Sequence, residues 1–149
     1  MDDDVGRFLL DLYRAGREIP YPGFKDWVFE QLGGLIGFDS AWWGSGSERP
    51  LHVHRVALFR CDPAILEAYP QFIEEDFFRD AVSRHPGKAM LFSDLMDRDS
   101  FEQTKIYREF GRRFKVEWSM GVVLIEPVSS LNEFITVWRH DVRDPFHED

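Results

Sequence analysis

Cysteine is almost absent from this chain of 149 residues, which holds a single thiol at Cys61. One cysteine excludes an internal disulfide and a cysteine-rich zinc site, and it is typical of a reducing compartment, so we expect a cytoplasmic location. Long hydrophobic runs are absent as well, since no apolar stretch approaches the roughly 20 residues of a membrane span. The first residues, MDDDVGRF, are acidic, whereas a secretory signal peptide begins with basic residues.

Basic residues are also scarce. Lys and Arg number 18 against 27 Asp and Glu, the net charge is -9, and no run of Lys or Arg exceeds two residues. This balance argues against direct binding of nucleic acid or of an anionic membrane by this stretch of chain. Aromatic residues are abundant instead, at 15% with 14 Phe and 5 Trp, and 44% of residues are apolar. The sequence therefore predicts one packed domain over residues 1–149.

Catalytic and cofactor motifs are missing too, because GxSxG, HExxH, P-loop and GxGxxG patterns do not occur. His52 and His54 share one face of a predicted strand, which is one geometry for a metal pair, but a third ligand at suitable spacing is missing. We therefore predict neither a metal site nor a cofactor. Cys61 precedes a predicted helix whose dipole could lower its pKa, as in a redox sensor; a structural thiol at the end of a strand is the alternative.

Hydrophobic spacing predicts the order of elements. Helices are expected over residues 5–13 and 22–36, strands over 39–46 and 51–59, and helical segments over 61–84. A short extended piece over 89–95 and a helix over 99–114 follow, with Asp99 and Glu102 at capping-box spacing. Strands over 117–126 and 132–140 complete the chain. This order predicts an α+β fold with a five-stranded, mostly antiparallel sheet.

Both faces of this sheet are apolar in the last two strands, and such a sheet needs cover on both faces. We expect the first two helices on one face and the later helices on the other. Trp42 and Trp43 are adjacent on a strand, so they point to opposite faces. The later helical layer is rich in aromatic residues, and it forms either a bulky core or an apolar pocket for a small ligand.

Several runs of sequence together resemble the N-terminal sensor domain of LuxR-type transcriptional regulators. They are GFDSAWWG, LFRCDPAILEAYPQFIEEDFF, PGKAMLFSDLM, FEQTKIYREFGRRF and FITVWRHDVRDPFHED. The resemblance implies a GAF/PAS-like α/β/α sandwich that senses a small molecule, acts as a homodimer and controls a DNA-binding helix-turn-helix beyond this chain. Residues 146–149 resemble the start of the helix that leads toward that segment. The best-known members of the group bind acyl-homoserine lactones.

The resemblance carries over to particular residues only in part. It places Trp42, Gly44 and Gly46 on the ligand face and Trp43 on the back. Asp76 lies where those members have an aspartate that accepts the amide of the signal, although Phe77 replaces the usual proline; the alternative is an exposed acidic helix face.

Other positions depart from the quorum-sensing pattern. Leu66 and Pro70 stand near the places of an expected tryptophan and tyrosine, and Leu91 and Phe92 near that of a second tryptophan. We therefore predict an apolar or aromatic ligand rather than a lactone.

The predicted ligand site lies between the sheet and the later helices, with Asp76 or Thr136 as its polar anchor. Its residues are Trp42, Gly44, Tyr69, Asp76, Tyr107, Phe110, Trp118, Met120, Phe134, Thr136 and Trp138. On this hypothesis Trp42→Ala weakens binding and leaves the fold intact. Two alternatives remain open: a ligand-free dimerisation or docking module, and a small cyclase or isomerase with Asp39, His52 or His54 as its base.

Overall fold

The chain divides into two compact units, Met1–Asp39 and Ser40–Asp149, in a computed structural model that describes residues 2–147. The first unit holds helices α1 (Asp2–Glu18) and α2 (Gly23–Ile36). Three aspartates in the first turn of α1 complement its dipole. Gly37 ends α2 with φ 59°, and its N–H donates to the Gly33 carbonyl at 3.0 Å. Both predicted helices are confirmed, and α1 is longer at each end than predicted.

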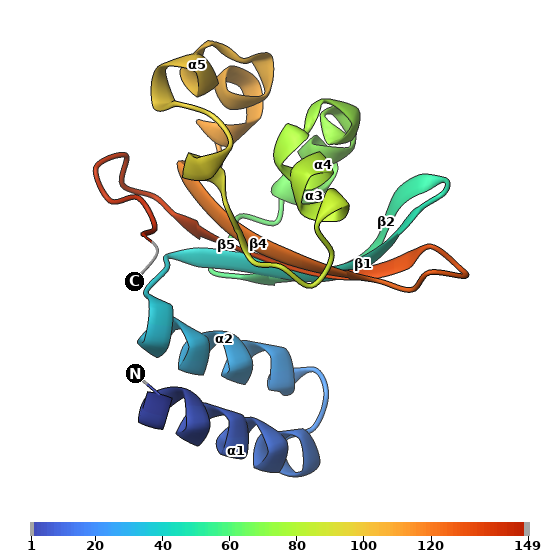
Figure 1. Cartoon of the computed structure of the whole chain (residues 1–149), viewed down its shortest axis with the longest axis vertical. Coiled ribbons are helices and arrows are strands. Elements are labelled where there is room, and N and C mark those ends of the chain that lie inside the picture. Colours follow the sequence, from blue (N-terminus) through green and yellow to red (C-terminus); the bar gives the residue numbers. More distant parts are fainter. Residues whose placement is uncertain (1, 148–149) are drawn as a thin grey trace. The chain divides into compact units, whose positions relative to one another are not determined.

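The second unit is built on one antiparallel sheet (Figure 1). Its strands are β1 (Ser40–Glu48), β2 (Leu51–Phe59), β3 (Met90–Leu91), β4 (Trp118–Ile125) and β5 (Leu131–Arg139). They lie in the order β2-β1-β5-β4-β3, and every neighbouring pair is antiparallel. The α+β class and the five-stranded antiparallel sheet are therefore confirmed.

A layer of short helices covers one face of this sheet (Figure 1). It contains α3 (Ile65–Ala68), α4 (Phe77–Arg84) and α5 (Arg98–Gln103). Single 3-10 turns at Tyr69–Gln71, Ile73–Glu75 and Phe92–Asp94 connect them, and a π-helical turn at Tyr107–Gly111 follows α5. The layer is thus made of short helices and single turns, and it carries many aromatic side chains.

The helix predicted over residues 99–114 is broken in two. Thr104 is extended, with ψ 149°, so α5 ends before it. The predicted capping box is also wrong, because the cap of α5 is Asp97, whose carboxylate accepts the Ser100 N–H at 2.9 Å. Glu102 pairs instead with Arg98, at 2.8 Å. The sequence DRDS contains two aspartates that could cap the helix. Sequence spacing alone favoured Asp99, whereas the structure shows Asp97 as the cap.

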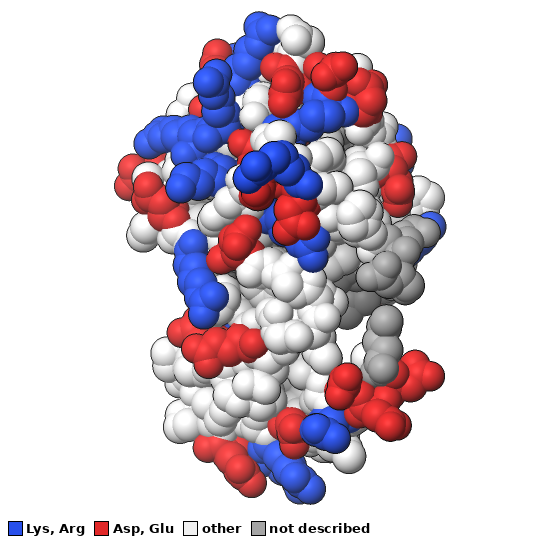
Figure 2. Space-filling view, turned by 90° about the vertical axis from the view of Figure 1, so that its left-hand side faces the viewer, with Lys and Arg blue, Asp and Glu red and all other residues white. Residues whose placement is uncertain are grey.

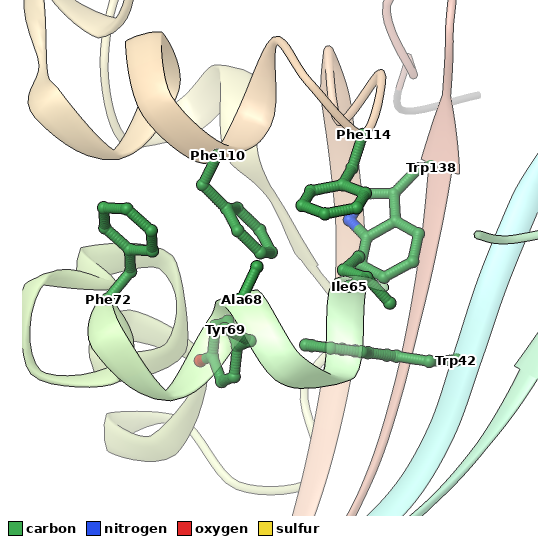
Figure 3. Packing of buried hydrophobic residues seen from close by; sticks show 8 residues of the cluster. All are labelled: Trp42, Ile65, Ala68, Tyr69, Phe72, Phe110, Phe114 and Trp138. Carbon is green, nitrogen blue, oxygen red and sulfur yellow. The ribbon is translucent and has the colours of Figure 1, made fainter. Parts of the chain in front are cut away.

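Two clusters of buried side chains hold the helical layer against the sheet. The first, shown in Figure 3, joins strands β1 and β5 to α3, the 3-10 turn that follows it and the segment after α5. Its members are Trp42, Ile65, Ala68, Tyr69, Phe72, Phe110, Phe114 and Trp138. The second gathers around α4 and β4; its members are Phe78, Val82, Phe92, Phe101, Tyr107 and Val123. The aromatic-rich later layer is thus a packed core in large part.

Strand register sets which side chains meet on the covered face. Trp42 of β1 pairs with Thr136 of β5, Gly44 with Phe134, and Gly46 with Asn132. A Cβ on Gly44 would lie 2.4 Å from the Arg55 carbonyl oxygen and 2.5 Å from Phe134 Cζ. The space beside Gly44, a residue of the predicted ligand site, is therefore filled by the Phe134 ring.

The opposite face of the sheet carries Trp43. Its indole N–H donates to the Glu133 carboxylate at 3.3 Å, across the neighbouring strand β5. The prediction that the first two helices cover this face concerns the relation between the two units and stays a prediction.

Two further findings concern membrane-spanning helices and the distribution of surface charge. No helix among residues 2–147 is both long and apolar enough to cross a membrane. On the face shown in Figure 2, basic and acidic side chains are interspersed.

Gly44→Ala is expected to lower the free energy of unfolding by roughly 3 kcal/mol, because the new methyl group collides with a backbone carbonyl and a buried ring. Gly34→Ala in α2 is the matched control: among residues 2–147, and apart from the neighbouring backbone of α2, no atom lies within 4 Å of its Cβ position. This change should therefore stabilise the helix by up to about 1 kcal/mol. Urea denaturation measures both. Equal stability of Gly44→Ala and wild type would contradict the register of β1 and β5.

Candidate functional site

A cavity of about 110 Å³ lies within the second unit, between the sheet and the helical layer. Seven of the predicted site residues line it: Trp42, Tyr69, Asp76, Phe110, Phe134, Thr136 and Trp138. They come from β1, β5, the turns around α3 and α4, and the π-helical turn. Four predicted residues do not line it: Gly44, Tyr107, Trp118 and Met120. The structure thus brings most of the predicted set together around one space.

Strand β4 presents the opposite face from the one predicted. Gly121 pairs with Thr136, and a Cβ on it would meet Phe78 of α4 at 3.1 Å. Residues 119, 121 and 123 therefore face the helices, and the adjacent Met120 does not. Placing Trp118 and Met120 in the lining was wrong, because both faces of this strand are apolar and the pattern could not fix its parity.

Two other predicted residues have different roles. Tyr107 is held outside the cavity by a polar cluster: its hydroxyl donates to the Glu117 carboxylate at 3.0 Å and accepts from Arg98 at 2.9 Å. Trp118 lies beyond it and donates its indole N–H to the Val142 carbonyl at 3.0 Å. Tyr107 thus joins the π-helical turn to α5 and to the residue before β4, whereas Trp118 bonds the segment after β5, and neither side chain lines the cavity.

Trp42 forms one wall of the cavity. Its ring contacts Tyr69, Trp138 and Phe134 edge-on, with centroids 5.0, 5.1 and 5.9 Å apart. It is only 7% exposed and belongs to the core cluster of Figure 3. Trp42→Ala would therefore remove core packing, which typically costs about 3–5 kcal/mol. The expectation that this change spares the fold is wrong.

The indole N–H of Trp42 is buried and has no hydrogen-bond partner among residues 2–147. Buried donors without a partner are rare in folded proteins, and they often mark a site completed by water or a ligand. The indole nitrogen of Trp42 is therefore the first polar feature of the site.

Asp76 connects the wall of the cavity to helix α4. It is the N-cap of α4, since its carboxylate accepts the Arg79 N–H at 3.1 Å, and its other oxygen accepts the Tyr69 hydroxyl at 2.7 Å. Burial raises the pKa of Asp76 above its usual value of 3.8. Burial and the neighbouring Asp76 also raise the pKa of Tyr69, so its hydroxyl remains a donor. Asp76 lines the cavity and does not lie on an exposed acidic helix face.

A second polar group lies at the other end of β1, and the sequence hypothesis missed it. One oxygen of Glu48 accepts from Asn132 at 2.7 Å and from Ser83 at 3.2 Å. The other accepts from Arg79 at 3.2 Å. All four side chains line the cavity. Little in the sequence indicates this group, because Asn132 stands beside another polar residue, Glu133, at the start of its strand.

Two atoms of this group lack partners. Nε of Arg79 and Oδ1 of Asn132 are buried and make no hydrogen bond to residues 2–147. One is a donor and the other an acceptor. This part of the cavity wall thus has one donor and one acceptor without a partner in the described chain.

The structure also describes the surroundings of the Cys61 thiol and of the His52–His54 pair. Burial and the adjacent Asp62 raise the pKa of the Cys61 thiol to about 11, which is opposite to the lowering expected from a helix dipole. The helix that follows, α3, begins only at Ile65. The His52 and His54 rings are 4.9 Å apart. In the part of the chain that the structure describes, no group of three His, Cys, Asp or Glu side chains could hold a metal ion.

Comparisons with protein families and with curated proteins find no match for this chain. Solved structures do match. The ligand-binding domain of VqsR from Pseudomonas aeruginosa has a TM-score of 0.64 at 15% identity, over 94% of this chain and 80% of that one. CepR2 from Burkholderia cenocepacia, an N-acylhomoserine-lactone-dependent LuxR family transcription factor, has a TM-score of 0.71 at 12% identity, over 100% and 84%.

Escherichia coli SdiA matches as well, with a TM-score of 0.62 at 15% identity, over 94% of this chain and 57% of SdiA. Identities this low establish the fold. The chain has the fold of the ligand-binding domains of LuxR-type regulators, as the sequence resemblance predicted.

Asp76→Asn tests the environment of the buried carboxyl. Because the folded-state pKa of Asp76 lies above its unfolded value near 3.8, the folded chain binds this proton more tightly. Ionisation of Asp76 therefore destabilises the fold as pH rises from the unfolded to the folded pKa. Asparagine removes that titration and can still accept the Tyr69 hydroxyl.

The stability of Asp76→Asn relative to wild type should accordingly rise between about pH 3.5 and pH 7. Urea denaturation over this pH range measures the difference in the free energy of unfolding between the two proteins. Tyr69, Arg79 and Asp80, which interact with Asp76, are present in both proteins. A difference that is constant or falls with pH would contradict the burial of Asp76.

Proposed function

We propose that this chain is a non-catalytic sensing domain, which binds an apolar small molecule in the cavity between the sheet and α3–α5. The observation that carries the proposal is that Trp42 lines the cavity and has a buried indole N–H without a partner among residues 2–147. A ligand carbonyl or ether oxygen would accept this hydrogen bond while its apolar body packs against Phe110 and Phe134. Apolar walls with a few fixed polar groups are typical of small-molecule sites.

The comparisons support a sensing role through the fold. CepR2 depends on an N-acylhomoserine lactone, and a second SdiA structure holds octanoyl-rac-glycerol. Both compounds carry an acyl group on an uncharged polar head. The departures at Leu66, Pro70, Leu91 and Phe92 lead us to propose an acyl compound other than a homoserine lactone for this chain.

The proposed output is a change in the helical layer. The π-helical turn Tyr107–Gly111 places Phe110 against the cavity and Tyr107 in the polar cluster with Arg98 and Glu117. Single π turns are frequent at functional sites. A ligand that packs on Phe110 would favour one arrangement of this turn, and regulation follows if its affinity differs between two states. Homodimerisation and control of a DNA-binding helix-turn-helix beyond this chain are part of the proposal.

The alternatives make different demands. A docking module needs no ligand, and an isomerase needs a base in the cavity. Three residues that line the cavity could act as a base: Glu48, His52 and Asp76. Glu48 is held by Arg79 and Asn132, and Asp76 caps α4. These carboxylates have structural partners, which favours binding over catalysis.

Trp42→Phe tests the anchor, because phenylalanine keeps an aromatic ring and removes the N–H. Titration calorimetry should detect binding of methyl octanoate to the wild-type chain. Trp42→Phe should weaken this binding about 3- to 10-fold, which corresponds to the loss of one hydrogen bond. The matched control is Trp43→Phe, on the opposite face of β1, which should bind within about twofold of wild type.

A bound ligand should also raise the wild-type melting temperature. Binding of methyl octanoate that is weakened equally by Trp42→Phe and Trp43→Phe would contradict the proposed anchor. The absence of any binding or melting shift across medium-chain acyl esters and amides would favour the docking module.

A further inference from the structure

The polar end of the cavity identifies the chemistry of the ligand more closely than the Trp42 end does. We call it the Asn132 end; it is formed by Gly46, Glu48, Arg79, Ser83 and Asn132. Trp42 and Gly46 are four residues apart on β1, and they pair with Thr136 and Asn132 of β5. At the rise of an extended strand, the Cα atoms of Trp42 and Gly46 are about 13 Å apart.

The Asn132 end lacks one hydrogen-bond donor and one acceptor. Asn132 uses its Nδ2 to donate to Glu48, so its buried Oδ1 needs a donor. Arg79 uses its Nη atoms for Glu48 and Asp80, so its buried Nε needs an acceptor. A hydroxyl group is the smallest group that donates and accepts at once, and a primary or secondary amide can do the same.

Charge at this end disfavours an anionic ligand. The Arg79 guanidinium is shared between the carboxylates of Glu48 and Asp80, and its backbone N–H bonds a third carboxylate, Asp76. One cation among three carboxylates leaves no surplus positive charge for a ligand carboxylate or phosphate. A negatively charged head would have to enter a partly buried space beside like charges, which is unfavourable.

The lining of the cavity is mostly apolar and includes Ile73, Phe78 and Phe134. An alkyl chain is the simplest group that packs against such side chains and joins one polar end of the cavity to the other.

Resting on the proposed sensing function, we propose that the ligand is an uncharged, medium-chain acyl compound with a hydroxyl or amide group at its far end. Its carbonyl oxygen accepts the indole N–H of Trp42. Its terminal hydroxyl donates to Oδ1 of Asn132 and accepts from Nε of Arg79, and the alkyl chain between them packs against Phe134.

The test compares three probes that share one eight-carbon chain and one methyl ester. They are methyl 8-hydroxyoctanoate, methyl octanoate and the monomethyl ester of octanedioic acid, which end in a hydroxyl, a methyl and a carboxylate. At neutral pH the hydroxy ester should bind wild type about tenfold more tightly than methyl octanoate, which corresponds to one completed buried hydrogen-bonding site. The carboxylate should bind more weakly than methyl octanoate.

The variant Asn132→Leu locates the preference. It should abolish the advantage of the hydroxy ester, so that the ratio of the two affinities, hydroxy ester over methyl octanoate, falls from about ten to about one. Glu133→Gln is the matched control, since Glu133 is the next residue on β5 and bonds Trp43 on the other face; it should keep the tenfold advantage. The wild-type comparison of the three probes decides the matter even if Asn132→Leu does not fold.

The outcomes separate the two proposals. Equal binding of the hydroxy ester and methyl octanoate, or tighter binding of the carboxylate, would overturn the assignment of the Asn132 end and leave the sensing function standing. Loss of both neutral esters in Asn132→Leu to the same extent would also overturn it. Binding of none of the three probes to wild type would overturn the sensing function together with the head-group assignment.

Discussion

The pairing of β1 with β5 is the constraint on which the rest of the structure depends. It places a glycine opposite a large side chain at Phe134 and the large side chain of Trp42 opposite a small one at Thr136. The backbone of β1 can then approach its neighbours closely at Gly44 and Gly46, and the Phe134 ring lies over β1. A one-residue slip would move Trp42 to the other face and bring Trp43 into the aromatic layer. Both the core and the cavity depend on this register.

The balance between packing and polar groups explains how one layer can be both core and site. Aromatic contacts around Trp42, Tyr69 and Phe110 stabilise the fold, whereas buried polar atoms without partners oppose it. Three such atoms, on Trp42, Arg79 and Asn132, lie around one cavity and are not scattered through the core. A ligand that completes these hydrogen bonds would stabilise the layer that it contacts, which is the energetic basis of the proposed response.

Sequence patterns predicted elements and faces where one signal dominated. The strand pattern around Trp42 and the alternation Phe134, Thr136, Trp138 placed four of the seven lining residues that were predicted. Tyr69 and Phe110 came from the aromatic-rich helical layer, and Asp76 came from the family resemblance. The pattern failed where two signals were equal, as at Asp97 and Asp99 for the helix cap or on β4, where both faces are apolar. It could not reveal that Phe134 fills the space over Gly44, or that Glu48, Arg79 and Asn132 meet, because these contacts depend on tertiary register.

The most direct test of the account is the indole N–H resonance of Trp42 in a two-dimensional ¹H–¹⁵N spectrum, assigned with Trp42→Phe. The N–H has no partner in the described structure, so a ligand oxygen should change its surroundings more than those of any other tryptophan. Addition of methyl 8-hydroxyoctanoate should shift the Trp42 resonance downfield, as a new hydrogen bond does, and leave the Trp43 resonance in place. Saturable binding that leaves the Trp42 resonance unmoved would contradict the placement of the ligand site in this cavity.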